Sequence, residues 1–249
     1  MKRLGPSLTL AGTLLAFPLS TAGEEPRKPP LFIGETLRYT MSVFGVVGGE
    51  MTLSAREVNL DEQPAYRLQL SAISNDMLSK FFLVRDFLVS WVDPRTLRSL
   101  RFEKHTVEGK RVRDELIEFD YEEGIARRGE KTIPIGETAL DSLSSVYYLR
   151  TLPLEVGKPI ELEVVHKQTD TLRVEVQARE RITVPAGTFS TIRVEPKSKG
   201  ASLVGKGKSL VLWLTDDERK IPVQIKSKLS VGTLIGRLQS IETSASAGR

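Results

Sequence analysis

The stretch Thr36-Leu-Arg-Tyr-Thr-Met-Ser-Val-Phe44 decides the fold class, because apolar and polar side chains alternate along it. Leu37, Tyr39, Met41 and Val43 fall on one face, and polar side chains fall on the other. A period of two residues is typical of a β-strand that buries one face and exposes the other. The fold is therefore expected to begin with a half-buried strand.

A reversal and two more strands follow directly. Gly45-Val-Val-Gly-Gly49 permits a tight turn, since glycine adopts positive φ at little cost. Residues 51–55 and 66–72 then alternate in the same way as the first strand. Three consecutive strands joined by short turns indicate an antiparallel meander.

The same pattern continues almost to the C-terminus. Further strands are expected at 81–91, 100–107, 111–119, 125–135, 159–166, 171–183, 188–195, 208–215, 221–229 and 233–242. Residues 75–80 are expected to form a helical turn. We predict an all-β fold of about 12 antiparallel strands in a curved sheet, barrel-like or a sandwich, with one short helix.

The short helix is expected at Asp141–Arg150. The apolar and aromatic residues Leu143, Val146 and Tyr147 follow helical spacing, and the side chain of Asp141 can accept the free amides of the first turn.

An offset of 123 residues aligns one half of the chain with the other. The matched positions are Gly34 with Gly157, Ala55-Arg-Glu57 with Ala178-Arg-Glu180, Asp93 with Asp216, Gly109 with Gly232 and, with one residue of slippage, Trp91 with Trp213. The pattern predicts two related halves, 34–120 and 157–243, joined by a connector at 121–156. They could form one continuous structure or two small domains. We favour a single β domain over 31–243, because each half is small and has no disulfide to support it.

The N-terminus has the features of a secretory signal peptide. Lys2 and Arg3 precede an apolar run at 8–17 that is too short to span a bilayer, and small residues follow at Ser20 and Ala22. We expect cleavage after Ala22, a flexible leader at 23–30 and a disordered tail at 244–249. The predicted location is the periplasm of a Gram-negative bacterium.

Composition excludes several classes of function. Without residues 1–22, 34 Lys and Arg remain against 32 Asp and Glu, so the chain lacks the strong positive field of a nucleic-acid-binding protein. The absence of cysteine excludes disulfides, a cysteine nucleophile and an acylated cysteine anchor. No second apolar run is long enough to serve as a transmembrane anchor.

Four short motifs occur in a familiar order. They are Gly34-Glu-x-Leu-x-Tyr39, Asp141-x-Leu-Ser-x-x-Tyr-x-Leu-Arg150, Pro185-Ala-Gly-Thr-Phe189 and Trp213-Leu-x-Asp-Asp-x-x-x-Ile-Pro-Val223. Together they resemble a family of exported bacterial proteins known as domain of unknown function 3108, over residues 31–242. The resemblance implies a location in the cell envelope and a mainly β fold, and it carries over no catalytic residues.

No catalytic or metal-binding signature stands out. His105 and His166 are 61 residues apart and lack the local spacing of metal ligands, so we interpret them as surface or strand-edge residues. Asp93, Asp216 and Asp217 are expected to organise turns by accepting backbone amides. The sequence predicts no cofactor and no metal.

Aromatic residues are the best candidates for a binding site. Phe81, Phe82, Phe87 and Trp91 form the most aromatic stretch, and Trp213 occupies the equivalent position in the second half. These residues either pack in the core or line a patch for a lipid-like ligand. The basic loop Lys197–Lys208 offers weak contact with anionic lipid, or is a loop kept soluble by its lysines.

The sequence therefore favours an exported, non-enzymatic envelope protein that binds an apolar ligand or a protein partner. Two alternatives remain open. One is a hydrolase acting on envelope glycan or lipid through carboxylates that the fold brings together. The other is a purely structural interaction module.

Overall fold

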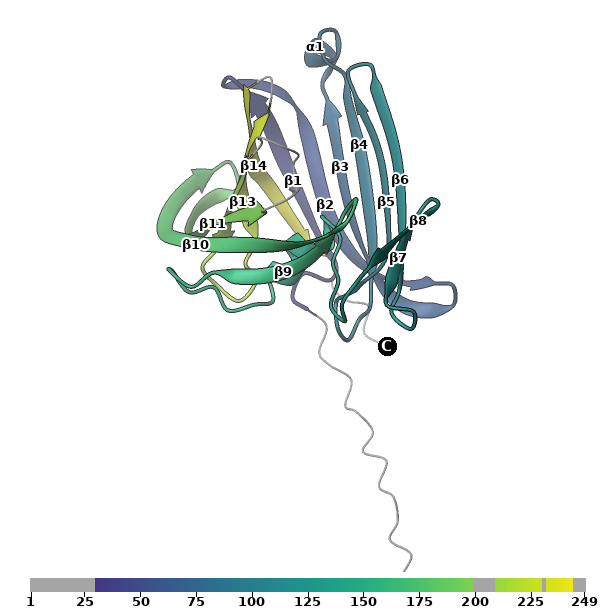
Figure 1. The fold of residues 1–249 in the computed structure, drawn as a ribbon. Helices are drawn as coiled ribbons and strands as arrows, with labels where there is room; N and C mark the ends of the chain where they lie inside the picture. The colour runs from purple at the N-terminus through teal and green to yellow at the C-terminus, as the bar shows by residue number, and fades with distance from the viewer. Residues whose placement is uncertain (1–29, 199–208, 230–231, 244–249) are drawn as a thin grey trace, which may run out of the picture.

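In the computed structural model, which describes residues 30–198, 209–229 and 232–243, the strands form one antiparallel sheet of 14 strands (Figure 1). They are β1 Glu35–Val43, β2 Val46–Leu60, β3 Gln63–Ser74, β4 Val84–Val92, β5 Ser99–Glu108, β6 Arg111–Asp120, β7 Ile125–Arg128, β8 Lys131–Pro134, β9 Ile160–Val165, β10 Thr169–Val184, β11 Gly187–Ser198, β12 Ser209–Thr215, β13 Pro222–Leu229 and β14 Gly232–Thr243. Two short helices, α1 Asp76–Ser79 and α2 Ser144–Leu149, complete the described elements. The all-β prediction is confirmed.

The sheet curls into a nearly closed, barrel-like shape (Figure 1). Each strand pairs with its neighbours in sequence, except that β8 and β9 do not pair with each other and β1 pairs with β14, which joins the two ends of the chain. The two edges are β8 and β9. The segment after β8 covers β9, because the Leu140 amide donates to the Glu163 carbonyl (3.0 Å) and the Val165 amide donates to the Leu140 carbonyl (2.8 Å).

Fourteen strands, rather than about 12, result partly from a hairpin at 125–134. A single edge strand was expected there, but Gly129 has a φ of 58° and reverses the chain between β7 and β8. Pro134 ends β8 at the open edge of the sheet, where a missing amide does not interrupt pairing.

The strand predicted to begin at Phe81 begins only at Val84. Phe81 and Phe82 instead lie in the connection that follows α1, whose first turn is capped by the side chain of Asn75 accepting the Leu78 amide at 2.9 Å. This local hydrogen bond favours a helical turn over continued strand, because it satisfies an amide that would otherwise lack a partner.

The two halves of the chain have corresponding strands under the offset of 123 residues. Shifted by 123, the bounds of β2 become 169–183, and β10 covers Thr169–Val184. Likewise β3 shifts to 186–197, and β11 covers Gly187–Ser198. Gly34 and Gly157 both have positive φ, at 83° and 85°. The runs β1–β6 and β9–β14 therefore share their strand pattern, with β7, β8 and α2 between them.

Two clusters of buried apolar side chains fill the structure. The first lies inside the curled sheet and includes Leu37, Tyr39 and Phe102. The second lies on β9–β12 and includes Leu214. The helix α2 contributes Tyr147 to the first cluster and Leu149 to the second, so it packs between them. Strand β12 is buried on both faces, because its side chains point alternately into the first and the second cluster.

A buried ion pair joins three distant segments beside this core. Arg150, after α2, makes a two-pronged contact with Glu35 at the start of β1, with N–O distances of 2.8 and 3.0 Å. Both side chains are almost fully buried, at 2% and 1% exposed. Arg150 also donates to the carbonyl of Arg219 in the β12–β13 turn (3.1 and 3.2 Å). The guanidinium is thus satisfied on all sides by residues from three of the sequence motifs.

A second buried carboxylate fixes the start of α2. Asp141 accepts the amides of Leu143 (2.8 Å) and Ser144 (3.0 Å) with one oxygen. Its other oxygen accepts the hydroxyls of Ser90 on β4 (2.5 Å) and Ser99 on β5 (2.7 Å). The capping expected of Asp141 is therefore combined with anchoring of the helix to the sheet.

Replacing Glu35 with glutamine tests the buried ion pair. E35Q leaves Arg150 buried without its counter-ion, so we expect a loss of about 3–5 kcal/mol of unfolding free energy. Urea denaturation of the purified protein measures this loss. E242Q is the matched control: it breaks the exposed Arg38–Glu242 pair (2.8 Å), which should cost less than about 1 kcal/mol. Equal losses in the two variants would contradict the role assigned to Glu35.

Candidate functional site

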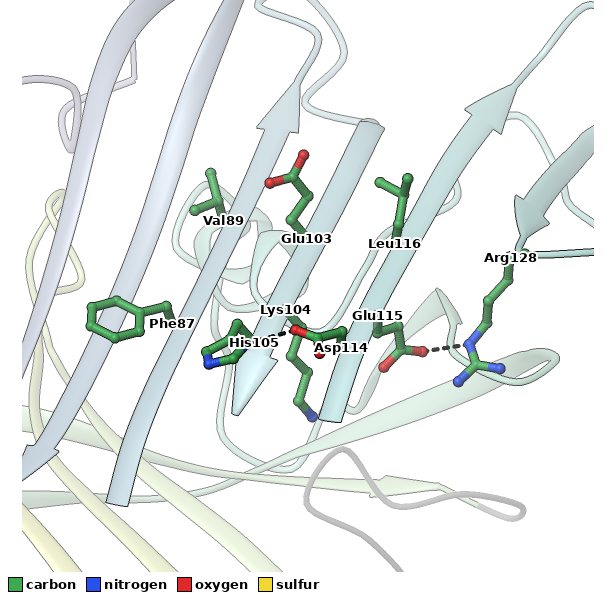
Figure 2. A pocket seen from close by; sticks show the side chains of 10 residues that line it. Phe87, Val89, Glu103, Lys104, His105, Asp114, Glu115, Leu116 and Arg128 are labelled. Atoms are coloured by element: carbon green, nitrogen blue, oxygen red, sulfur yellow. Dashed lines mark hydrogen bonds and ion pairs between the residues drawn. The ribbon is translucent and has the colours of Figure 1, made fainter. Parts of the chain in front are cut away.

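A hollow of about 600 Å³ lies over the middle of β4, β5 and β6 (Figure 2). Strand register places its side chains in two rows across the three strands. One row is Phe87, His105 and Asp114, and the next is Val89, Glu103 and Leu116. The remaining lining residues are Lys104, Glu115, Arg128 and Gly129.

The two rows lie on the outer face of the sheet. Side chains alternate between faces along a strand, and Phe102 on β5 and Ile117 on β6, which have the opposite parity, are buried in the core. Phe87 and Leu116 are 39% and 40% exposed, so the hollow presents apolar side chains to solvent.

An ion pair lies on each face of the sheet here (Figure 2). The His105–Asp114 pair is on the outer face with the floor. The Arg128–Glu115 pair is on the core face, because Glu115 and Arg128 share the parity of the buried Ile117 and Ala126. His105 Nδ1 lies 2.6 Å from Asp114 Oδ1, and Arg128 Nε lies 2.6 Å from Glu115 Oε1. No serine, threonine or cysteine lines the hollow, so the His–Asp pair has no nucleophile to activate there. In the part of the chain that the structure describes, no group of three or more His, Asp or Glu side chains is placed to hold a metal ion.

The apolar character continues beyond the hollow on the same face. In the row towards α1, Ile73 and Val112 are 46% and 59% exposed. In the row on the other side, Trp91 packs beneath the guanidinium of Arg101, which lies 5.7 Å from the indole centroid. The hollow is therefore the centre of a larger apolar patch that also contains charged side chains.

The structure separates the aromatic residues singled out in the sequence. Phe87 and Trp91 lie on the outer face of β4, at the hollow and next to it. Phe81 and Phe82 lie at the end of the sheet, outside any strand. Trp213 lies on β12 in the first core cluster, is 7% exposed, and donates from Nε1 to Glu180 (2.9 Å). His105 and Asp114, which the sequence did not single out together, are joined by strand pairing.

The three turn aspartates make different contacts. Asp93 Oδ1 accepts the amides of Arg95 (2.8 Å) and Thr96 (2.9 Å). Asp217 Oδ1 accepts the amides of Arg219 and Lys220, both at 3.0 Å. Asp216 pairs instead with Arg179, at 2.7 Å. Of the basic loop Lys197–Lys208, residues 199–208 lie outside the described residues.

Two partly buried polar groups lie on the core side: Asp86, which sequence reasoning missed, and His166, which it interpreted as a surface or strand-edge residue. Asp86 on β4 is half-buried, and burial, reinforced by the nearby charge of Glu108, raises its pKa to about 6. Its Oδ1 atom is buried without a hydrogen-bond partner. His166, in the β9–β10 turn, has a pKa lowered chiefly by burial. These groups face the inside of the sheet and do not contribute to the hollow.

A second hollow, of about 350 Å³, lies beside Arg150 and is lined by Phe32, Thr151, Arg219 and Lys220 among others. Because the guanidinium of Arg150 already bonds Glu35 and a backbone carbonyl, its donors are committed to the fold. This hollow is therefore a poorer candidate for ligand binding.

Comparison with protein families gives one match, to a family described as a protein of unknown function, DUF3108, over residues 38–239. No curated protein matches the chain.

Two solved structures align with most of this chain. A β-barrel-like protein of the domain of unknown function DUF1849, from Brucella abortus, has a TM-score of 0.59 at 10% identity and covers 88% of this chain and 100% of its own. A protein from Bacteroides fragilis with a YmcC-like fold, described as exported, has a TM-score of 0.32 at 8% identity, with coverage of 86% and 98%. The first similarity shows the fold. Among the described residues, no helix is long and apolar enough to cross a membrane.

The raised pKa of Asp86 makes a prediction about stability and pH. In the folded protein Asp86 keeps its proton up to about pH 6, whereas in the unfolded chain it loses the proton near the ordinary value of 3.8. Ionisation therefore destabilises the fold as pH rises from about 4 to about 6. We expect D86N to be more stable than wild type at pH 7, on the order of 1 kcal/mol after allowance for solvent screening, with the difference vanishing near pH 4.

Urea denaturation at pH 4, 5.5 and 7 provides the measurement. E137Q, which neutralises an exposed carboxylate, is the control and should change stability little at any of these values. A D86N variant that is less stable than wild type at pH 7 would show that the ionised carboxylate stabilises the fold.

Proposed function

We propose that this chain, which belongs to the DUF3108 family of proteins of unknown function, is an exported, non-enzymatic envelope protein that docks a protein partner on the outer face of β4–β6. The observation that carries the proposal is the hollow itself. It combines an exposed apolar floor with charged flanks, on a sheet face that nothing in the chain covers among the described residues.

Export is supported by the N-terminal sequence. The basic start, the short apolar run and the small residues before Ala22 match a cleaved secretory signal. The absence of cysteine is compatible with an oxidising compartment, since a core of this size does not need disulfides. The proposed location is the periplasm.

The openness of the hollow favours a protein over a small apolar ligand. Pockets for small ligands bury most of the ligand surface. Here the floor residues Phe87 and Leu116 stay about two-fifths exposed, and the hollow lies on a sheet face rather than inside the barrel. An apolar centre with a polar periphery is the usual composition of a protein–protein interface.

The charged flanks support recognition better than catalysis. His105 and Asp114 are exposed on the outer face, so this pair can orient an incoming polar group without a chemical step. One observation favours the rival hydrolase: Asp86 has a raised pKa and a carboxylate neighbour, Glu108. Asp86 points to the core side, away from the hollow.

The chain contains no cysteine, so single cysteines can carry a photocrosslinker to the hollow without other labelling. We expect F87C and L116C, each bearing a thiol-linked benzophenone, to crosslink a defined partner when incubated with the envelope fraction of the producing cell. Adding V89S to F87C should lower the yield about 5-fold, because apolar area is lost from the floor. Gel shift and mass spectrometry of the product provide the measurement.

T171C on β10 is the control, as its side chain is exposed on the other half of the sheet. Crosslinking that is equal at position 171, or insensitive to V89S, would count against the hollow as a docking site. A lipid or other small molecule recovered from organic extracts of the purified protein, and lost in L116S, would replace the partner with an apolar ligand.

A further inference from the structure

The end of the sheet that carries α1 has a continuous edge, which we call the rim and define as residues 44–47, 75–83 and 108–113 (Figure 1). These residues belong to the β1–β2 turn, the β3–β4 connection and the β5–β6 turn. Backbone hydrogen bonds hold the segments together: the Asn75 amide donates to the Gly48 carbonyl (2.8 Å), and the Gly109 amide donates to the Leu83 carbonyl (2.7 Å). The rim is thus one connected surface.

Exposed apolar side chains concentrate on the rim. Of the 12 large hydrophobic residues that are exposed in the described part of the chain, seven belong to it. They are Phe44, Val46, Val47, Met77, Phe81, Phe82 and Val112. Phe81 and Phe44 are 86% and 81% exposed, far more than the residues of the hollow. The turns at the opposite end of the sheet carry few such residues. Exposed apolar side chains are therefore concentrated at the end of the sheet that carries α1.

Glycine backbone supports several of these side chains. The ring of Phe82 lies against Gly109, Leu78 lies against Gly48, and the ring of Phe44 lies against Gly232. A Cβ atom at any of the three glycines would crowd the neighbouring side chain. These apolar side chains therefore lie against glycine backbone instead of packing into a side-chain core.

Charge distinguishes the two ends of the sheet. The rim carries four basic residues, Lys80, Lys110, Arg111 and Arg113, and two acidic ones, Asp76 and Glu108. The five turns at the opposite end, at 61–62, 93–98, 121–124, 185–186 and 216–220, carry eight acidic and four basic residues. An anionic surface would attract the rim and repel the other end, which orients the molecule.

We propose that the rim inserts its apolar side chains into the headgroup region of a bilayer that contains anionic phospholipid. Aromatic and aliphatic groups that project from several turns, mixed with Lys and Arg, match the interfacial region of a membrane, which is apolar on one side and negatively charged on the other. In this orientation the strands rise from the membrane and the hollow remains accessible to a partner. The inference does not depend on the hollow, because no residue of the rim lines the hollow.

Flotation of the purified protein with phosphatidylethanolamine vesicles, with and without phosphatidylglycerol, tests the proposal. Wild type should float only with vesicles that contain phosphatidylglycerol, and less at high salt. F44S/F81S should partition at least about 10-fold more weakly, because two largely exposed aromatic side chains no longer enter the bilayer. K80Q/K110Q/R111Q should bind several-fold more weakly, with a smaller salt dependence.

The control is L31S/V156S, which removes two exposed apolar side chains outside the rim and should float like wild type. Unfolding midpoints check that each variant folds. A bimane dye on M77C should shift to the blue with these vesicles, and the same dye on V156C should not.

Failure of wild type to float, equal flotation of F44S/F81S, or equal binding to vesicles without phosphatidylglycerol would overturn the proposal. Protection of the dye at position 77 by a protein of the envelope fraction, and not by vesicles, would also overturn it and assign the rim to a protein contact. The crosslinking result at positions 87 and 116 is separate, so either proposal can fail alone.

Discussion

The buried contact between Glu35 and Arg150 is the constraint on which the architecture depends. It joins the first strand, the connector between the halves and, through the Arg219 carbonyl, a turn of the second half. Removing two charges from water is costly, and the structure compensates with a two-pronged geometry and further bonds to the same guanidinium. Tyr39 adds a hydrogen bond to the Pro222 carbonyl at 2.6 Å. In a chain without cysteine, this cluster links distant segments that no disulfide can join.

Three of the four sequence motifs acquire a physical meaning from this contact. Gly34-Glu35, the Arg150 that ends the helix motif, and the turn after Trp213 are far apart in sequence and meet around one guanidinium. Gly34 adopts a φ of 83°, which a side chain would disfavour, and places Glu35 at the start of β1. These three motifs therefore describe how the sheet is held together.

Much of the fold could be predicted from local pattern, since alternation along Leu37–Met41 reports burial directly. Beyond it, a bulge after Met41 buries Ser42 and leaves Val43, expected on the buried face, only half-buried. The offset of 123 residues also anticipates the strand bounds of the second half. What sequence could not supply is long-range pairing. Asp141 was recognisable as a cap, but its bonds to Ser90 and Ser99 require β4 and β5 to pass beneath the helix. The pair of His105 and Asp114 follows from the register of one hairpin, yet the existence of a hollow there depends on which face the whole sheet turns outwards.

The two sheet edges have a consequence for folding. Strand β8 has only four residues and ends in Pro134, so it offers little to a neighbouring chain. Strand β9 has six residues, and its free side is covered by Leu140 of the connector. Until that connector docks, β9 exposes unpaired amides and carbonyls that can recruit another molecule. Docking of the connector, which also places Arg150 on Glu35, therefore covers the sheet edge at which another chain could pair.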